Sequence, residues 1–275
     1  MDICITTLIE NTANIGFIGE WGLSILVEVD GRRILLDTGP GISTVYNAHL
    51  LGIDFKTIDM VVLSHGHYDH TGGLKEVLRR GNGLDIISHP AIWEHKYAVR
   101  ENKAKYIGIP FHKEEMESLG ARFNMSKEPI WIIDNIVTSG EILLTTTYEE
   151  VDDVLYVKKD EDLRPDDLPD DLALAIKTEL GLVIILGCAH RGMINTISHF
   201  QKITGDERVH TVVGGTHLIH ASHERLTQTV IDLKKIGVQR LGTCHCTGFE
   251  ASARLAKEFG DMFFLNNAGS QHKLL

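Results

Sequence analysis

One short stretch limits what this chain can fold into, because a buried strand runs directly into a cluster of metal-binding residue types. The apolar run at residues 61–63 predicts a strand, and His65, His67, Asp69 and His70 follow it within six positions. In an extended turn, side chains two residues apart point to the same side, so His65 and His67 can reach one ion together. Asp69 and His70 can then reach a second position nearby. Imidazole and carboxylate ligands suit Zn, Mn, Fe or Co better than Ca or Mg. The density of ligands favours a metal site over a solvated histidine-rich loop.

Composition limits the class of protein around this site. The chain has 275 residues, of which 43% are hydrophobic and 24% charged, which is typical of a globular protein of one large or two smaller domains. Its formal net charge of −11 argues against a dedicated nucleic-acid binder. Four cysteines are too few for a disulfide scaffold in a chain of this length. We find neither a signal peptide nor a membrane-spanning run, so a cytoplasmic protein is expected.

Two hairpins divide the chain into similar halves. Asp30-Gly31 joins apolar runs at residues 23–29 and 33–37, and a second hairpin joins residues 172–178 to 182–186. Strands and helices alternate after each hairpin, so we expect an α/β (α+β) fold with mixed sheets covered by helices. Further strands are expected at residues 3–8, 61–64, 85–88, 130–138, 141–144, 209–213, 240–243 and 262–265.

Helix boundaries are predicted from capping residues. Ser43, Thr71, Ser222 and Thr247 are each placed to cap a helix at its N-terminus. Glycine follows the expected helix ends. The resulting helices are expected at residues 43–51, 71–81, 222–237 and 247–259, with another at 195–203.

The pattern loosens between residues 97 and 171, which we interpret as an insertion flanking a site within a single domain of residues 1–275. Residues 149–171 contain eleven acidic and three basic side chains, together with two prolines. This composition predicts a solvated loop or lid.

The other candidate site residues also lie just past apolar strands. Asp37 could form an Asx turn or be the carboxylate partner of a ligand histidine, and local sequence does not choose between these roles. His190 and His245 are expected to be metal ligands. His217 could contact substrate or orient a ligand. Asp171 could complete a metal site. Because ligands of α/β sheets gather at strand ends, these residues could converge on one site.

The cysteines near these histidines are treated separately. A Cys188 thiolate would be a good zinc ligand, although a small buried cysteine after a strand is the commoner case. Cys244 and Cys246 should point away from His245 if the chain there is extended, which makes them core residues.

The motif His65-x-His67-x-Asp69-His70, preceded by Asp37-Thr38-Gly39, resembles that of the metallo-β-lactamase superfamily. The segments at residues 187–192, 214–218 and 244–248 resemble a narrower branch, which includes archaeal 7,8-dihydropterin-6-methyl-4-(ribofuranosyl)aminobenzene-phosphate synthases. The resemblance implies a four-layer αββα sandwich with two metals at one edge. It also implies that His65 and His67 hold one ion, and that Asp69, His70 and His245 hold the other.

Two departures from the superfamily pattern concern the metal ligands. The usual third histidine has no counterpart after His70, and Gly187-Cys188 replaces the usual Gly-Asp. We infer that His190 takes over a metal position, with Asp171 or Cys188 as substitutes.

The resemblance leads to a metal-dependent hydrolase as the first functional hypothesis. Two divalent transition-metal ions, zinc first and Mn or Fe as alternatives, would activate a bridging water on an ester, lactone or phosphoester. Asp69 would accept a proton. The alternative is a synthase that releases pyrophosphate, with Trp21, Trp93 or Tyr97 stacking on a flat ring. Redox chemistry, RNA cleavage and metal-dependent sensing are less favoured. We expect a small-molecule substrate, no nucleic acid and no membrane; the oligomeric state is open.

Overall fold

The computed structural model describes residues 1–274, and the chain divides into two compact units. Unit 1 comprises Met1–Ser126, Asp152–Asp170 and Asn267–Leu275, and unit 2 comprises Lys127–Val151 and Asp171–Asn266. Each unit is described by itself. The residues expected to form an insertion are shared between the two units, and the expectation of a single domain stays a prediction.

Unit 1 is built on a seven-stranded mixed sheet with the order β18-β1-β2-β3-β4-β5-β8. Its strands are β1 (Ile3–Ile9), β2 (Ser24–Val29), β3 (Arg32–Leu36), β4 (Met60–Val62), β5 (Leu84–Ser88), β8 (Ala121–Met125) and β18 (Gln271–Lys273). Its helices are α1 (Ile42–Leu50), α2 (Tyr68–Thr71), α3 (Leu74–Arg80) and α4 (Lys113–Ser118), with the 3-10 turns η1 (Phe55–Thr57) and η2 (Pro90–Trp93). Strands β3, β4, β5 and β8 are parallel, so the loops after β3, β4 and β5 emerge at one edge of the sheet.

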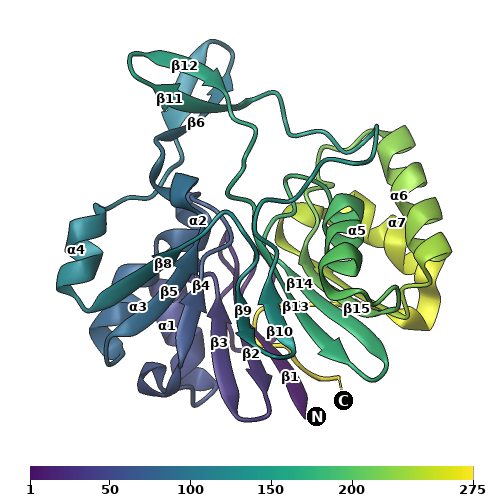
Figure 1. Ribbon diagram of the computed structural model, residues 1–275, viewed down its shortest axis with the longest axis horizontal. Coiled ribbons are helices and arrows are strands. Elements are labelled where there is room, and N and C mark those ends of the chain that lie inside the picture. The colour runs from purple at the N-terminus through teal and green to yellow at the C-terminus, as the bar shows by residue number, and fades with distance from the viewer. Residues whose placement is uncertain (275) are drawn as a thin grey trace. The chain divides into compact units, whose positions relative to one another are not determined.

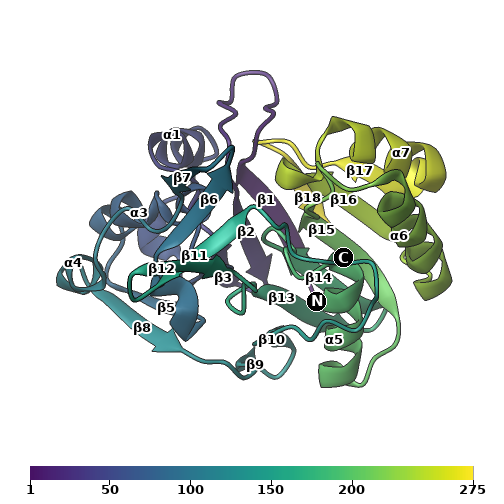
Figure 2. The same cartoon turned by 90° about the horizontal axis from the view of Figure 1, so that it is seen from above.

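The first hairpin confirms the turn expected at Asp30-Gly31. Both residues have positive φ, at 48° and 84°, and Val29 is the register partner of Arg32. A two-residue turn of this kind matches the twist of the flanking strands. Between β1 and β2 the chain extends as an irregular loop, visible at the top of Figure 2.

A second, four-stranded sheet of unit 1 was not predicted. It has the order β12-β11-β6-β7 and consists of β6 (Lys96–Arg100), β7 (Lys103–Tyr106), β11 (Leu155–Lys159) and β12 (Asp162–Pro165) (Figure 1). Two hairpins far apart in sequence form it, through the pairing of β6 with β11. The solvated loop expected at residues 149–171 is therefore wrong in two respects: it contains two strands, and four of its acidic side chains are buried. These are Glu149, Asp166, Asp170 and Asp171.

Unit 2 has its own seven-stranded sheet, ordered β17-β16-β15-β14-β13-β10-β9. Its strands are β9 (Trp131–Ile133), β10 (Ile136–Thr138), β13 (Ala173–Thr178), β14 (Gly181–Leu186), β15 (Val209–Gly215), β16 (Arg240–Cys244) and β17 (Phe263–Leu265). Its helices are α5 (Met193–Thr204), α6 (His223–Ile236) and α7 (Phe249–Phe259), with the 3-10 turns η3 (His245–Thr247) and η4 (Gly260–Met262). The single strand expected at residues 130–138 is two strands, and residues 141–144 form no strand.

Each unit has a separate hydrophobic core. In unit 2, all three helices pack on the sheet through one buried cluster that includes Phe200 of α5, Leu233 of α6 and Leu255 of α7 (Figure 1). In unit 1, the stripe of α3 predicted from Leu74, Val77 and Leu78 is buried in the corresponding cluster. The expected class of mixed sheets covered by helices is confirmed.

The predicted helix caps were correct at one of four positions. Ser222 caps α6 by accepting a hydrogen bond from the Arg225 amide at 3.1 Å. At α1, α3 and α7 the capping residue is a glycine without a side-chain bond. Ser43 instead donates to Glu20, Thr71 to the carbonyl of His67, and Thr247 to the carbonyl of Cys244. Among the described residues, no helix has the length and apolar character needed to cross a bilayer.

Candidate metal centre

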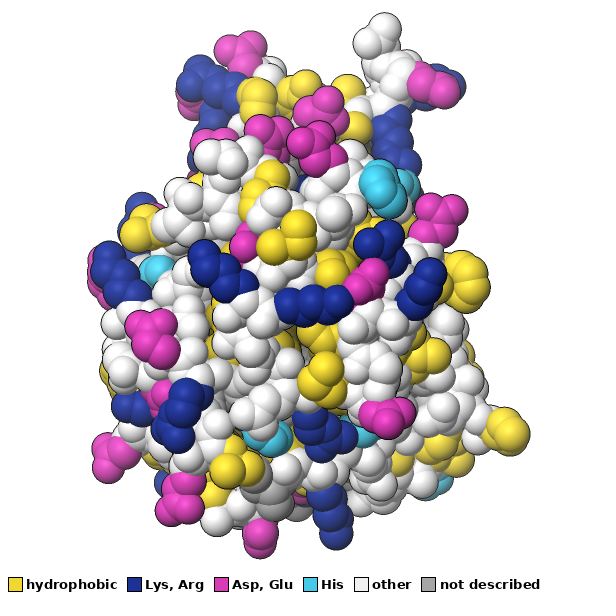
Figure 3. All heavy atoms as spheres, turned by 90° about the vertical axis from the view of Figure 1, so that its right-hand side faces the viewer, with side chains coloured by type: hydrophobic (Ala, Val, Ile, Leu, Met, Phe, Trp, Pro, Cys, Tyr) yellow, Lys and Arg dark blue, Asp and Glu magenta, His cyan; other side chains and the backbone are white. Residues whose placement is uncertain are grey.

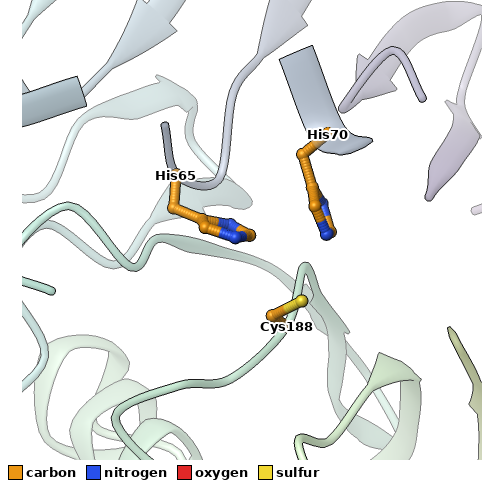
Figure 4. A group of neighbouring side chains, drawn as sticks. All are labelled: His65, His70 and Cys188. Atoms are coloured by element: carbon orange, nitrogen blue, oxygen red, sulfur yellow. The ribbon is translucent and has the colours of Figure 1, made fainter. Parts of the chain in front are cut away.

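The histidines of the unit 1 motif lie together at the end of β4. The His65 Nε2 and His67 Nδ1 atoms are 2.9 Å apart, and the ring centroids of His65 and His70 are 4.3 Å apart (Figure 4). Asp69 Oδ2 lies 3.9 Å from His70 Nε2. All four side chains are buried. Three imidazoles and a carboxylate gathered in this way form the donor set that divalent transition metals prefer.

Asp37, at the end of β3, makes the contacts of a carboxylate that orients ligand histidines. Its Oδ2 lies 2.6 Å from Nδ1 of His70, and it accepts hydrogen bonds from the hydroxyl and amide of Ser64 at 2.6 and 2.7 Å. The Ser64 hydroxyl in turn lies 2.9 Å from Nδ1 of His65. Nδ1 of both histidines is thus held from behind, and Nε2 of each ring is turned toward another residue of the motif, His67 for His65 and Asp69 for His70. Of the two roles considered for Asp37, the contacts match the carboxylate partner.

The histidines of unit 2 follow three neighbouring parallel strands. His190 comes after β14, His217 after β15 and His245 after β16, so all three stand at one edge of the sheet. The ligand atoms of Cys188, His190 and His217 lie within 4.8 Å of one another. Cys188 is on the loop after β14 (Figure 4).

The backbone at these strand ends is strained. Ala189, His217 and His245 all have φ between 50° and 53°, a region that residues with a Cβ seldom adopt. Strain of this kind costs of order 1–3 kcal/mol per residue and clusters at functional sites. Its presence at all three strand ends supports a functional role for the unit 2 set.

Cys246 departs from the sequence prediction. It was expected to point away from His245, but its Sγ lies within 4.8 Å of the ligand atoms of both His245 and Cys188. The chain at His245 enters η3 instead of continuing as a strand, which turns both side chains to the same side. Burial by itself raises the pKa of the Cys246 thiol, but hydrogen bonding with Cys188 and the charge of His245 lower that pKa well below its ordinary value. Cys244 instead accepts a hydrogen bond from Nδ2 of Asn266.

Asp171 and Glu149 fix the loop that carries His190. Asp171 Oδ2 accepts a hydrogen bond from the Arg191 amide at 2.8 Å. Glu149 accepts from the amides of Ile194 and Asn195 at the start of α5, at 2.9 and 2.8 Å. Burial raises the pKa of Glu149, opposed by these two hydrogen bonds. Sequence reasoning missed Glu149, because nothing in an acidic run distinguishes a buried acceptor from its solvated neighbours.

The sequence matches a known family and a curated relative over most of its length. The family described as the metallo-beta-lactamase superfamily matches residues 22–193. The 7,8-dihydropterin-6-methyl-4-(beta-D-ribofuranosyl)-aminobenzene-5'-phosphate synthase of Methanocaldococcus jannaschii is 38% identical, over 98% of this chain and 95% of that protein. The chain belongs to the metallo-beta-lactamase superfamily. The resemblance inferred from the sequence is confirmed, as is the fold class that it implied.

Two further relatives bear on the activity. The crystal structure of Tm1679, described as a metal-dependent hydrolase of the beta-lactamase superfamily, matches with a TM-score of 0.85 at 28% identity and covers 98% of each chain. Ribonuclease Z of Clostridium botulinum is 32% identical over 78 residues, which is 28% of this chain and 23% of that protein. The superfamily is one of enzymes, and its members include both hydrolases and a synthase.

Proposed function

We propose that the chain is a metal-dependent hydrolase, with two divalent transition-metal ions, zinc first, as its cofactor. The proposal is carried by one observation, the buried set of His65, His67, Asp69 and His70 with Asp37 and Ser64 behind it. The residues fit such ions, because imidazole nitrogens are presented with their opposite nitrogens already held. His190 and His245 are further predicted ligands.

The ions, Asp69 and Asp37 would then have different roles in the reaction. When bound, the ions would lower the pKa of a water molecule and polarise an ester, lactone or phosphoester oxygen. Asp69 would accept a proton; its buried carboxylate, on α2, lies 3.9 Å from Nε2 of His70. Asp37 would keep the proton of His70 on Nδ1, so that the lone pair of the ring is on Nε2.

The first prediction concerns metal content. Protein purified without added metal should contain bound transition metal, and His65→Ala or His245→Ala should each lower the metal-to-protein ratio measured by mass spectrometry. His220→Ala is the matched control, because His220 is exposed and outside both histidine sets. Unchanged metal content in both site variants would show the ligand assignment to be wrong. A screen of phosphodiester, lactone and thioester substrates with the loaded protein then tests hydrolysis.

The second candidate function is that of a synthase, favoured by two observations. One is the 38% identity to the synthase of Methanocaldococcus jannaschii. The other is a pocket of about 700 Å³ in unit 1 whose lining includes Trp93, Tyr106 and Phe111. A flat ring could stack on such side chains. Of the three aromatic residues proposed from the sequence, Trp93 is in this lining, Tyr97 meets the lining residue Tyr106 edge-on, and Trp21 is 47% exposed on the loop after β1.

The second prediction separates these candidates by their products. A dihydropterin-methyl diphosphate is incubated with metal-loaded protein, with and without the phosphorylated aminobenzene riboside, and pyrophosphate is measured. Release that requires the second substrate indicates the synthase, and equal release without it indicates hydrolysis. No release under either condition would exclude the synthase and leave the substrate screen to find the hydrolase substrate.

We further propose a small-molecule substrate instead of a nucleic acid. The net charge of −11 supports this, and on the face shown in Figure 3 basic side chains are interspersed with acidic ones instead of gathering in a patch. Four cysteines are too few for a disulfide scaffold in a chain of this length, so we propose that the protein acts in the cytoplasm.

A further inference from the structure

A fully buried lysine lies directly behind the metal-ligand loop of unit 1. Lys96, the first residue of β6, has no exposed surface. Its Nζ donates to Asp166 Oδ2 and Asp170 Oδ1, each at 2.8 Å, and both carboxylates are themselves buried. Lysine is almost never buried completely unless it is paired.

The charges within this cluster fix its protonation. Burial by itself lowers the pKa of Lys96, but the attraction of Asp170 and Asp166 and their hydrogen bonds outweigh burial and raise that pKa above its ordinary value. Lys96 is thus an ammonium ion between two carboxylates. The buried cluster needs further donors, because one ammonium does not balance two negative charges.

The two aspartates obtain those donors from different places. Asp166 Oδ1 accepts from the amide of Leu168, within its own segment, at 2.9 Å. Asp170 Oδ2 accepts from the amide of Gly66 at 2.8 Å. Gly66 lies between His65 and His67, so this hydrogen bond connects the cluster to the loop that carries both histidines.

Gly66 is also packed against the lysine itself. A Cβ atom at Gly66 would lie 2.3 Å from the Ile92 carbonyl oxygen and 3.1 Å from Cε of Lys96. The peptide is therefore confined on one side by η2 and the lysine stem, and held by Asp170 through its amide. A glycine is required here because no side chain fits.

We propose that Lys96 and Asp170 are positioning residues for the metal centre: Lys96 holds Asp170, Asp170 holds the Gly66 peptide, and that peptide sets the directions of His65 and His67. The inference rests on the proposed function, since it assigns His65 and His67 as ligands. Groups that orient metal ligands from behind typically change metal affinity 10–100-fold when they are lost. A merely structural ion pair would stabilise β6 without affecting the loop.

The test compares Asp170→Asn with Asp166→Asn. Each variant keeps side-chain volume, removes one negative charge beside Lys96 and can present its amide oxygen to the lysine. In Asp170→Asn the new NH₂ group then faces the backbone amide of Gly66, and in Asp166→Asn it faces the backbone amide of Leu168. The two changes are matched in all but their connection to the ligand loop. Lys96→Met is less suitable, because it leaves two buried carboxylates unpaired and could prevent folding.

Three measurements are made on the full chain: thermal unfolding, metal affinity by competition with a chelator, and the NMR shifts of the His65 and His67 rings in metal-free protein. We expect similar loss of thermal stability in both variants. Only Asp170→Asn should weaken zinc binding, by about 10–100-fold, and shift the ring signals. The cobalt-substituted spectrum should change in the same variant.

Equal effects of both variants on affinity and ring signals, or no effect of Asp170→Asn, would overturn the proposal. The two levels of inference can fail separately. If wild-type protein binds no metal, the proposed function is wrong. The ring signals of the metal-free protein still report whether Asp170 orients His65 and His67.

Discussion

Asp37 determines which nitrogen of His70 carries the proton, so the tautomer of this ring depends on one carboxylate. With Asp37 ionised, the proton of neutral His70 belongs on Nδ1, 2.6 Å from the carboxylate oxygen. An amide at this position would also have to accept from Ser64, and would then turn its NH₂ group toward His70. That arrangement favours the tautomer with its proton on Nε2, where an ion would otherwise bind.

A third prediction follows at this scale. Asp37→Asn should weaken metal binding by about 10–100-fold, measured by chelator competition, and should change the His70 tautomer seen by nitrogen NMR. Asp85→Asn is the control, because that side chain is 55% exposed and pairs with Arg122. An Asp37→Asn protein with wild-type metal affinity would show that this carboxylate does not orient the ligand.

Some residues of the candidate site could be predicted from the sequence and others could not. His65, His67, Asp69 and His70 could be named because the motif is contiguous and follows a strand. The contact of Asp37 with His70 could only be offered as one of two roles, because it spans residues distant in sequence. Lys96 carries no local signal at all. Its burial depends on Asp166 and Asp170 folding back over it, which charge composition does not reveal.

At the scale of elements, α5 begins without a side-chain cap from its own N-cap residue. Gly192 occupies that position, and the amides of Ile194 and Asn195 are satisfied by Glu149 from a distant segment. A Cβ atom at Gly192 would lie 2.3 Å from a Glu149 oxygen, so the glycine permits this close approach. The loop that carries His190 ends at this point.

The fourth prediction is that Glu149→Ala destabilises the protein by about 1–3 kcal/mol, because it leaves buried amide donors without their acceptor. Urea unfolding measures the change. Glu224→Ala is the control. Glu224 is exposed in the first turn of α6, where its negative charge interacts favourably with the helix N-terminus, as that of Glu149 does at α5, but it makes no buried hydrogen bonds of the kind that Glu149 makes. Equal stability of the two variants would mean that Glu149 is not the effective cap of α5.

The misplaced caps have a related explanation. Ser43, Thr71 and Thr247 precede apolar helical patterns, as capping residues do, but each hydroxyl donates to another acceptor. For Ser43 this is the side chain of Glu20, and for Thr71 and Thr247 it is a carbonyl four and three residues earlier. A capping bond contributes about 1 kcal/mol, and another hydrogen bond of similar strength, local or distant, can replace it. Ser222, exposed at the start of α6, meets no such competition.

For the whole molecule, the sequence predicted the two hairpin-led halves and the strands at the centre of each sheet. These strands contain apolar runs, whose burial is evident from the sequence. The four-stranded sheet was missed because every residue of β7 and β12 is exposed and both strands are rich in charge. Strand β18 was missed because Gln271–Lys273 is polar and short. Such strands form where a neighbour offers unpaired backbone groups, which a local pattern does not record.

The pairing of β18 with β1 sets a limit on when unit 1 can finish folding during synthesis. Cys4 and Thr6 have Lys273 and Gln271 as register partners, so the sheet joins residues from opposite ends of the chain. Until residues 271–273 leave the ribosome, β1 exposes a row of open backbone groups to any other nascent chain. The histidine loop after β4 is translated early. The sheet beneath it keeps an open edge until all of unit 2 has been synthesised. We expect slow synthesis of the second half to lengthen the time for which this edge is open to aggregation.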